Sequence, residues 1–143
     1  MQKFEDVLSV LLITLTIFLA LSALAGGVGL LTGLNAPPVE QLGDSIFKDF
    51  TIPGLSLGIL VGGGSIVAAV LLIRKNRFAV MAAMAAGIFI MFFEFVEVLV
   101  IGAPAGVARN LQIFYFGLGT AIAAVAMVNW FCDILWNEGP AQS

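Results

Sequence analysis

Two glutamates occupy an apolar stretch of the chain in which ionisable side chains are costly. Glu94 and Glu97 lie within the otherwise apolar run 92–98. At the centre of a membrane span a charged side chain costs about 2.5–3.5 kcal/mol on insertion scales. Because the two residues are three apart, a helix places both on one face. Two close carboxylates in a low dielectric cannot both ionise freely, so one is protonated, or Arg109 or a bound cation neutralises both.

A second polar group follows in the next apolar stretch. Gln112 and Tyr115 are also three apart and share one helix face. If this helix runs antiparallel after a short loop, residues whose numbers sum to about 210 lie at one depth. Glu97 is then level with Gln112, Glu94 is level with Tyr115, and Arg109 lies at the mouth above them. We therefore predict one polar cluster of Glu94, Glu97, Arg109, Gln112 and Tyr115.

This cluster has two interpretations, and the sequence leaves both open. In the first, the cluster forms an outward-facing polar pocket that holds a proton, a cation or a small ligand. In the second, Arg109, Gln112 and Tyr115 satisfy the glutamates and only lock two helices together. Glu97 lies near the interface and can reach water, whereas Glu94 lies about 10 Å inside the outer end of its helix.

The elements that position these residues are predicted by composition. The chain has 143 residues, of which 61% are hydrophobic and 10% charged, whereas a soluble domain is nearer half apolar and a quarter charged. A membrane-spanning helix needs roughly 20 mostly apolar residues. We predict an all-α membrane protein with one domain, residues 1–143, whose four transmembrane helices span about 7–31, 52–73, 78–101 and 111–136. The first apolar run continues past Ala23-Leu24-Ala25 to Leu31, which favours a retained helix over a cleaved signal peptide.

A short basic turn between the second and third spans indicates the orientation. Arg74, Lys75 and Arg77 are three of the six Lys and Arg residues in the chain. Short loops with positive charge stay cytoplasmic. We therefore expect a multi-pass protein of the inner (plasma) membrane with both termini in the cytoplasm and the other two loops outside.

Small residues spaced four apart predict how the helices pack. Helices in lipid associate through close backbone approach rather than through the hydrophobic effect, so such spacing marks contact faces. Every span has such a contact face of small residues, namely Ala25, Gly29 and Gly33; Gly54, Gly58 and Gly62; Ala79, Ala83 and Gly87; and Gly119 and Ala123. We predict an up-and-down bundle in which the second, third and fourth spans are sequential neighbours. One small face can instead serve a homodimer or a membrane partner protein.

The chain lacks the residues that several kinds of enzyme and metal chemistry usually require. The chain has no histidine and one cysteine, which removes the usual proton shuttle, the commonest zinc ligand and any CxxC pair. No nucleotide loop, HExxH or GxSxG motif occurs, and the net charge of −3 comes without a basic run. We expect no enzyme activity, no cofactor, no metal site and no nucleic-acid partner.

Three motifs carry a resemblance to known proteins. They are Asp49-Phe50-Thr51-Ile52-Pro53-Gly54, Val61-Gly62-Gly63-Gly64 and Leu111-Gln112-Ile113-Phe114-Tyr115-Phe116-Gly117. In these the chain resembles a widespread group of small bacterial four-helix membrane proteins, which are similar in layout to DoxX-like proteins. The resemblance covers most of the chain, from Ala25 to Gly119, and implies the four-helix fold without an assigned activity. In such proteins the place of Glu97 is usually Gln or Glu, whereas that of Glu94 is commonly apolar, so the double acid is particular to this chain.

Two function classes follow from these observations. The first is a structural or accessory membrane protein whose bundle binds membrane lipids or a partner protein and carries an outward-facing polar cluster. The alternative is a small proton-coupled transporter, working as a dimer, that uses Glu94 as its coupling carboxylate. Glu94 lies off the midplane, whereas transporter sites usually lie near it, and this position favours the first class.

Overall fold

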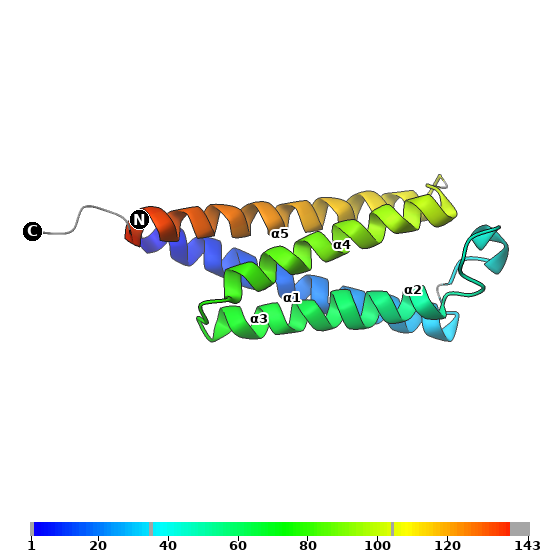
Figure 1. Ribbon diagram of the computed structural model, residues 1–143, viewed down its shortest axis with the longest axis horizontal. Coiled ribbons are helices and arrows are strands. Elements are labelled where there is room, and N and C mark those ends of the chain that lie inside the picture. The colour runs from blue at the N-terminus through cyan, green and yellow to red at the C-terminus, as the bar shows by residue number, and fades with distance from the viewer. Residues whose placement is uncertain (1, 35, 104, 138–143) are drawn as a thin grey trace, which may run out of the picture.

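The protein is an all-helical up-and-down bundle (Figure 1). The structure is a computed structural model, and it describes residues 2–34, 36–103 and 105–137. Within these ranges no strand is present, and four helices are long and apolar enough to cross a membrane. The elements are α1 (Gln2–Thr32), η1 (Val39–Leu42), α2 (Thr51–Leu55), η2 (Ser56–Gly63), α3 (Gly64–Ile73), α4 (Ala79–Ile101) and α5 (Val107–Asn137).

The predicted fold of four long apolar helices is confirmed, and each predicted span falls on one continuous helical stretch. The second span consists of α2, η2 and α3, which follow one another without a break. The first and fourth spans are longer than predicted, since α1 and α5 each contain 31 residues. Hydropathy marks only the apolar part of a helix, and the helical hydrogen bonds of α1 continue into the polar residues around Glu5 and Asp6.

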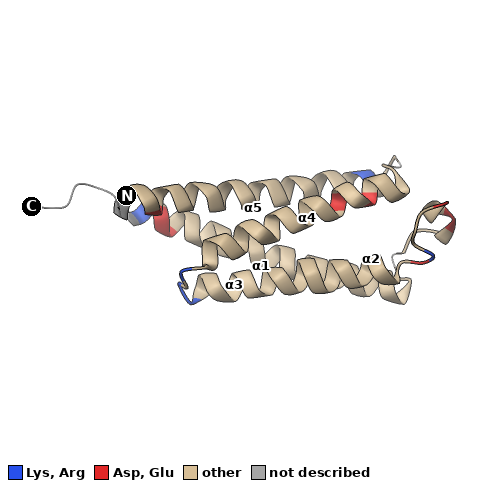
Figure 2. Cartoon of the chain, viewed as in Figure 1, with Lys and Arg blue, Asp and Glu red and all other residues tan. Residues whose placement is uncertain are grey.

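The α3–α4 turn contains the basic residues that indicated the orientation. Lys75 reverses the chain with a φ of 50°. Asn76 then stabilises the turn before α4, because the backbone N–H of Phe78 donates to Asn76 Oδ1 over 3.0 Å. Figure 2 shows the Lys and Arg residues of this turn at one end of the bundle. We call this end, with the turn 74–78, the inner end. The opposite end, with residues 36–50 and residues 102, 103, 105 and 106, is the outer end.

Helix α1 changes partners along its length, and so does α4 (Figure 1). Near the inner end α1 lies against α5, where Asn129 Nδ2 donates to Ser9 Oγ over 3.5 Å. Near the outer end α1 packs on the second span, where a Cβ atom added to Gly27 would lie 2.8 Å from the carbonyl oxygen of Gly54. Helix α4 leaves α3 at the inner end and joins α5 toward the outer end. The outer half therefore consists of two helix pairs, α1 with the second span and α4 with α5.

The close approach of α4 and α5 depends on two glycines. A Cβ atom on Gly87 would lie 2.7 Å from the carbonyl oxygen of Gly119, and one on Gly119 would lie 2.6 Å from that of Gly87. No side chain fits between backbones at this distance. The contact faces that the sequence predicted at Gly87 and Gly119 are thus confirmed.

The second span contains a π-helical segment, η2, that the sequence does not predict. Its eight residues include Gly58, Gly62 and Gly63, and α1 packs directly against it. The π-helix is rare, and it concentrates at functional sites. The contact face predicted at Gly54, Gly58 and Gly62 is confirmed, because Cβ atoms added to these glycines would lie 3.2 Å from the Gly27 carbonyl oxygen, 3.9 Å from Gly27 Cα and 3.0 Å from Leu24 Cγ of α1.

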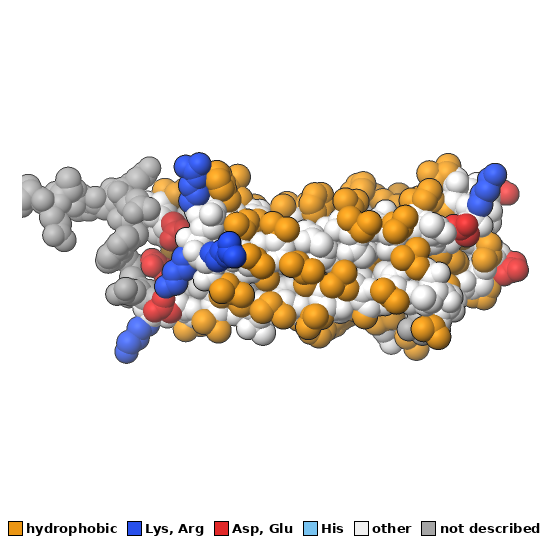
Figure 3. Space-filling model, turned by 90° about the horizontal axis from the view of Figure 1, so that it is seen from below, with side chains coloured by type: hydrophobic (Ala, Val, Ile, Leu, Met, Phe, Trp, Pro, Cys, Tyr) orange, Lys and Arg blue, Asp and Glu red, His pale blue; other side chains and the backbone are white. Residues whose placement is uncertain are grey.

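The bundle buries small and aliphatic side chains and exposes large apolar ones. Leu12, Ala83, Ile90 and Ile122 are buried in the core. Figure 3 shows hydrophobic side chains along the middle of the molecule, with Lys, Arg, Asp and Glu gathered toward its two ends. This surface matches helices whose outer faces contact lipid, because a water-soluble protein rarely exposes so large a continuous apolar area.

Candidate functional site

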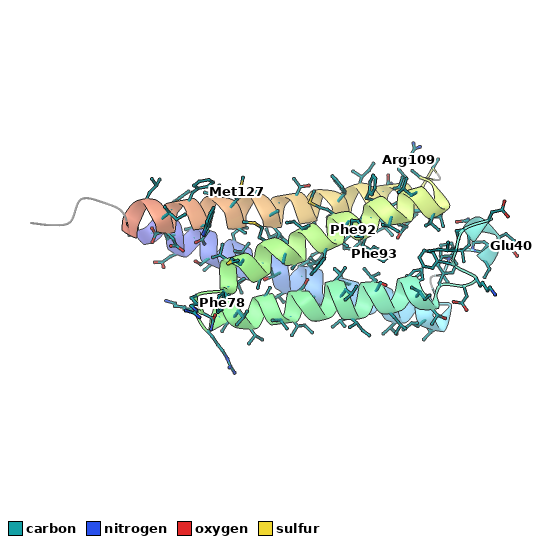
Figure 4. The ribbon with its side chains drawn as sticks, in the orientation of Figure 1. Glu40, Phe78, Phe92, Phe93, Arg109 and Met127 are labelled. Atoms are coloured by element: carbon teal, nitrogen blue, oxygen red, sulfur yellow. The ribbon has the colours of Figure 1, made fainter. Side chains whose placement is uncertain are left out.

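A cleft of about 760 Å³ lies in the outer half of the bundle, between the two helix pairs. One wall comes from α1 and the second span, including Gly26, Ser56 and Leu57. The other comes from α4 and α5, and Figure 4 shows Phe93 extending from α4 toward the second span. The cleft exists because the pairs diverge toward the outer end, and its volume lies in the range of small-molecule sites.

The connection between α1 and α2 closes part of the mouth of this cleft. Leu42, Phe47 and Phe50 all line it, and Leu42 and Phe50 are buried. The connection is fixed where it enters α2, because the backbone N–H of Thr51 donates to Asp49 Oδ1 over 2.9 Å. Hydrogen bonds from Thr51 lower the pKa of the exposed Asp49 carboxyl below its usual value. Phe47 and Phe50 thus line the mouth on either side of Lys48 and Asp49, a placement that the sequence does not predict.

Glu94 is the buried acid of the cleft. Its side chain is 6% exposed and lines the cleft from α4. Among the residues that the structure describes, none donates a hydrogen bond to its carboxyl group. Tyr115, which we predicted at the same depth, lines the same cleft from α5. Glu94 is therefore a polar group that is nine-tenths buried, faces a cavity and has no partner in the described ranges.

Glu97 differs from Glu94 because a side chain of α5 satisfies it. Gln112 Nε2 donates to Glu97 Oε1 over 3.0 Å and to the carbonyl oxygen of Gly102 over 3.1 Å. Gln112 is only 4% exposed, and both bonds are partly buried. The predicted register, with Glu97 level with Gln112, is confirmed.

Arg109 does not join the other four residues. Its side chain is exposed, is not part of the cleft lining and points away from the bundle in Figure 4. In the described part of the chain it forms no ion pair with Glu94 or Glu97. The predicted neutralisation of the glutamates by Arg109 is thus not observed, because the long side chain reaches water at the end of α5.

The cleft combines an acidic position with aromatic and aliphatic walls. Among the described residues that line it, Glu94 and Glu97 are the charged ones, and none is Lys or Arg. Within the described ranges, no group of three or more His, Cys, Asp or Glu residues could hold a metal ion. The arrangement can accept a proton or a cationic group at the acids and an apolar group along the walls.

Comparison with known proteins finds no match to this chain. No protein-family model, curated protein or solved structure matches this chain. The resemblance to DoxX-like proteins therefore stays a prediction, and the cleft is interpreted from its own geometry.

Proposed function

We propose that this protein is a membrane bundle that binds a lipid-like amphiphile in the cleft between its two helix pairs. The cleft of about 760 Å³ carries this proposal. Small-molecule sites are concave and mostly apolar, with a few polar groups that fix orientation. This cleft has that composition, since Leu57, Leu60 and Phe93 supply apolar wall and Glu94 supplies a polar group.

The position of the polar groups indicates how an amphiphile would lie. Glu97 is about one helical turn closer to the outer end than Glu94, and the apolar walls continue below both. When the polar head group lies beside Glu94 and Glu97, the apolar tail contacts the walls from α1 and the second span. The basic turn at the opposite end supports an outward-facing mouth, because positive loops stay cytoplasmic.

Photochemical labelling tests this function. The protein is reconstituted in lipid nanodiscs with an uncharged amphiphile that carries a diazirine in its tail, and the labelled peptides are mapped after irradiation. Label is expected on the cleft walls. Ser56→Trp, which fills the cleft, is expected to reduce this label several-fold, whereas Ile59→Trp is the control because Ile59 is exposed and outside the lining. Equal labelling of both variants, or label on lipid-facing positions only, contradicts the proposal.

A proton-coupled transporter is the second candidate, and Glu94 favours it. A glutamate that is 6% exposed, with no hydrogen-bond donor to its carboxyl group in the described ranges, can exchange a proton for a cationic substrate. Its test is proton release from liposomes that contain the protein, on addition of candidate cations. Release by the wild type that is lost in Glu94→Gln supports transport. No release by a stable wild-type protein, with equal behaviour of Glu94→Gln, rejects it.

A further inference from the structure

We infer that the cleft selects an amphiphile whose head group carries a single positive charge, and that Glu94 binds this head group as its counter-ion. This inference rests on the proposed amphiphile-binding function and names the class of ligand. Four observations carry it, namely the charge of the lining, the partners of the two glutamates, the aromatic side chains and the size of the cleft.

The charge of the lining is entirely negative. Glu94 lies in the middle of the α4 wall, and Glu97 lies about one turn closer to the outer end. Neither helix pair places a Lys or Arg among the described residues that line the cleft. Arg109 is the basic residue nearest in sequence to the α5 wall, and it is exposed outside the lining. Lys48, in the connection over the mouth, is likewise exposed outside the lining and lies beside Asp49. A cationic head group inside the cleft would therefore meet no positive side chain among the described lining residues.

The two glutamates are not equivalent, and the difference identifies Glu94. Glu97 already accepts a hydrogen bond from Gln112. Glu94 faces the cleft with 6% of its surface exposed and with no donor in the part of the chain that the structure describes. An ionised carboxylate in such a place is costly unless a positive charge pairs with it. A bound cation supplies that charge.

The aromatic side chains supply a second attraction for a cation. Phe93 and Phe89 line the cleft from α4, Tyr115 from α5, and Phe47 and Phe50 from the connection over its mouth. The faces of aromatic rings attract ammonium and similar organic cations by about 0.5–2 kcal/mol, most strongly where water is excluded. Neutral or anionic head groups do not gain this attraction to the faces of aromatic rings.

The size of the cleft favours an organic cation over a metal ion. A hard divalent ion takes about six to eight oxygen ligands at close range, whereas two carboxyl groups line this cleft of about 760 Å³. The walls are mostly apolar, so most of a ligand's surface would contact hydrocarbon. A protonated amine, a quaternary ammonium or a phosphonium with apolar substituents satisfies both parts of the site.

A pair of probes with one shape and opposite charges tests the inference. Tetraphenylphosphonium and tetraphenylborate are titrated separately into the full chain in nanodiscs of zwitterionic lipid, and binding to empty nanodiscs is subtracted. We expect saturable binding of the phosphonium at least about tenfold tighter than that of the borate, which corresponds to about 1.4 kcal/mol. This comparison needs no variant. Equal affinities, or tighter binding of the borate, overturn the inference.

Two variants locate the bound cation. Glu94→Gln, which keeps the shape but removes the charge, is expected to weaken phosphonium binding about tenfold and to leave borate binding unchanged. Glu97→Gln is the matched control, because its amide oxygen can still accept from Gln112, and a smaller loss is expected. If Glu94→Gln does not fold, Phe93→Leu replaces it, with a loss of a few-fold in phosphonium affinity alone. An unchanged phosphonium affinity in folded Glu94→Gln overturns the assignment to Glu94, and an unchanged affinity in Phe93→Leu overturns the aromatic contribution.

The outcome also separates this inference from the proposed function. If the uncharged photoreactive amphiphile labels the cleft but the phosphonium shows no preference, the cleft binds amphiphiles and Glu94 does not select their charge. In that case Glu94 is protonated beside a neutral ligand, and the inference fails alone. If neither probe enters the cleft, the proposed function fails as well.

Discussion

Gln112 on α5 donates its side-chain N–H to the carboxyl group of Glu97 on α4, and this 3.0 Å bond joins the two helices at the outer end of the cleft. The same nitrogen also donates to the carbonyl oxygen of Gly102, which ends α4. One amide nitrogen thus donates to both an acid of α4 and the carbonyl group at the end of that helix. Glu97 has a structural role, which leaves Glu94 as the acid available to a ligand.

Removal of the Gln112 amide should destabilise the bundle. Gln112→Leu leaves Glu97 and Gly102 without their donor, and an unsatisfied buried polar group costs about 1–3 kcal/mol. Reversible unfolding in mixed micelles measures the loss. The double variant Glu97→Leu, Gln112→Leu should be closer to the wild type than the sum of the single variants predicts, because both partners become apolar. Strict additivity would show that the hydrogen bond contributes nothing.

The contact between Gly87 and Gly119 should tolerate no side chain. In Gly87→Ala the new Cβ atom would lie 2.7 Å from the carbonyl oxygen of Gly119, so α4 and α5 must separate. Overpacking of this kind costs about 1–3 kcal/mol. Gly117→Ala is the control, because a Cβ atom there would meet no atom within 4 Å. Thermal unfolding of the two variants measures the difference, and equal midpoints would disprove the tight contact.

The orientation in the membrane can be tested with single cysteines. In a Cys132→Ser background, which removes the only cysteine, Gln41→Cys lies between the first and second spans and Asn76→Cys lies in the basic turn. A membrane-impermeant maleimide added to intact cells should label the Gln41→Cys protein and spare the Asn76→Cys protein until the membrane is permeabilised. The reverse labelling pattern would place both termini outside.

The start of α2 should weaken in acid. The pKa of Asp49 is lowered by hydrogen bonds from Thr51, so its carboxylate stabilises the folded connection above the unfolded pKa. That stabilisation is lost as the pH falls from about 4 through the folded pKa. Hydrogen exchange of the Thr51 amide should accelerate relative to its intrinsic rate over this range. Asp49→Asn keeps an acceptor without a titrating charge and should show no such change.

The sequence predicts the helices and their depths well because those properties are local to each span. A span has to match the bilayer in length, which gives its bounds, and an antiparallel neighbour after a short loop gives its register. The pairing of Glu97 with Gln112 follows from that register. The small faces at Gly87 and Gly119 are predictable for a related reason, since only glycine permits such close backbones.

A polar pocket at Glu94 and Glu97 was one of two interpretations that the sequence left open, but the apolar walls of the cleft could not be predicted, because they depend on how whole helices cross. No pattern within α1 or α4 shows that each changes partners between the two ends of the bundle. A long side chain at a helix end, such as that of Arg109, can point either to water or into the cleft. Because the residue spacing is the same in both cases, the sequence does not distinguish them. The π-helical segment Ser56–Gly63 depends on backbone hydrogen bonds that glycine allows but does not require.

The continuity of α1 has a mechanical consequence. This helix is unbroken from Gln2 to Thr32, with Ser9 against Asn129 near one end and Gly27 against Gly54 near the other. It is therefore a stiff rod whose two ends belong to opposite sides of the bundle. A tilt of its inner end relative to α5 therefore displaces the part of α1 that carries Gly26 and lines the cleft. A force applied at the inner end then changes the width of the cleft through the helix backbone alone, without successive side-chain movements.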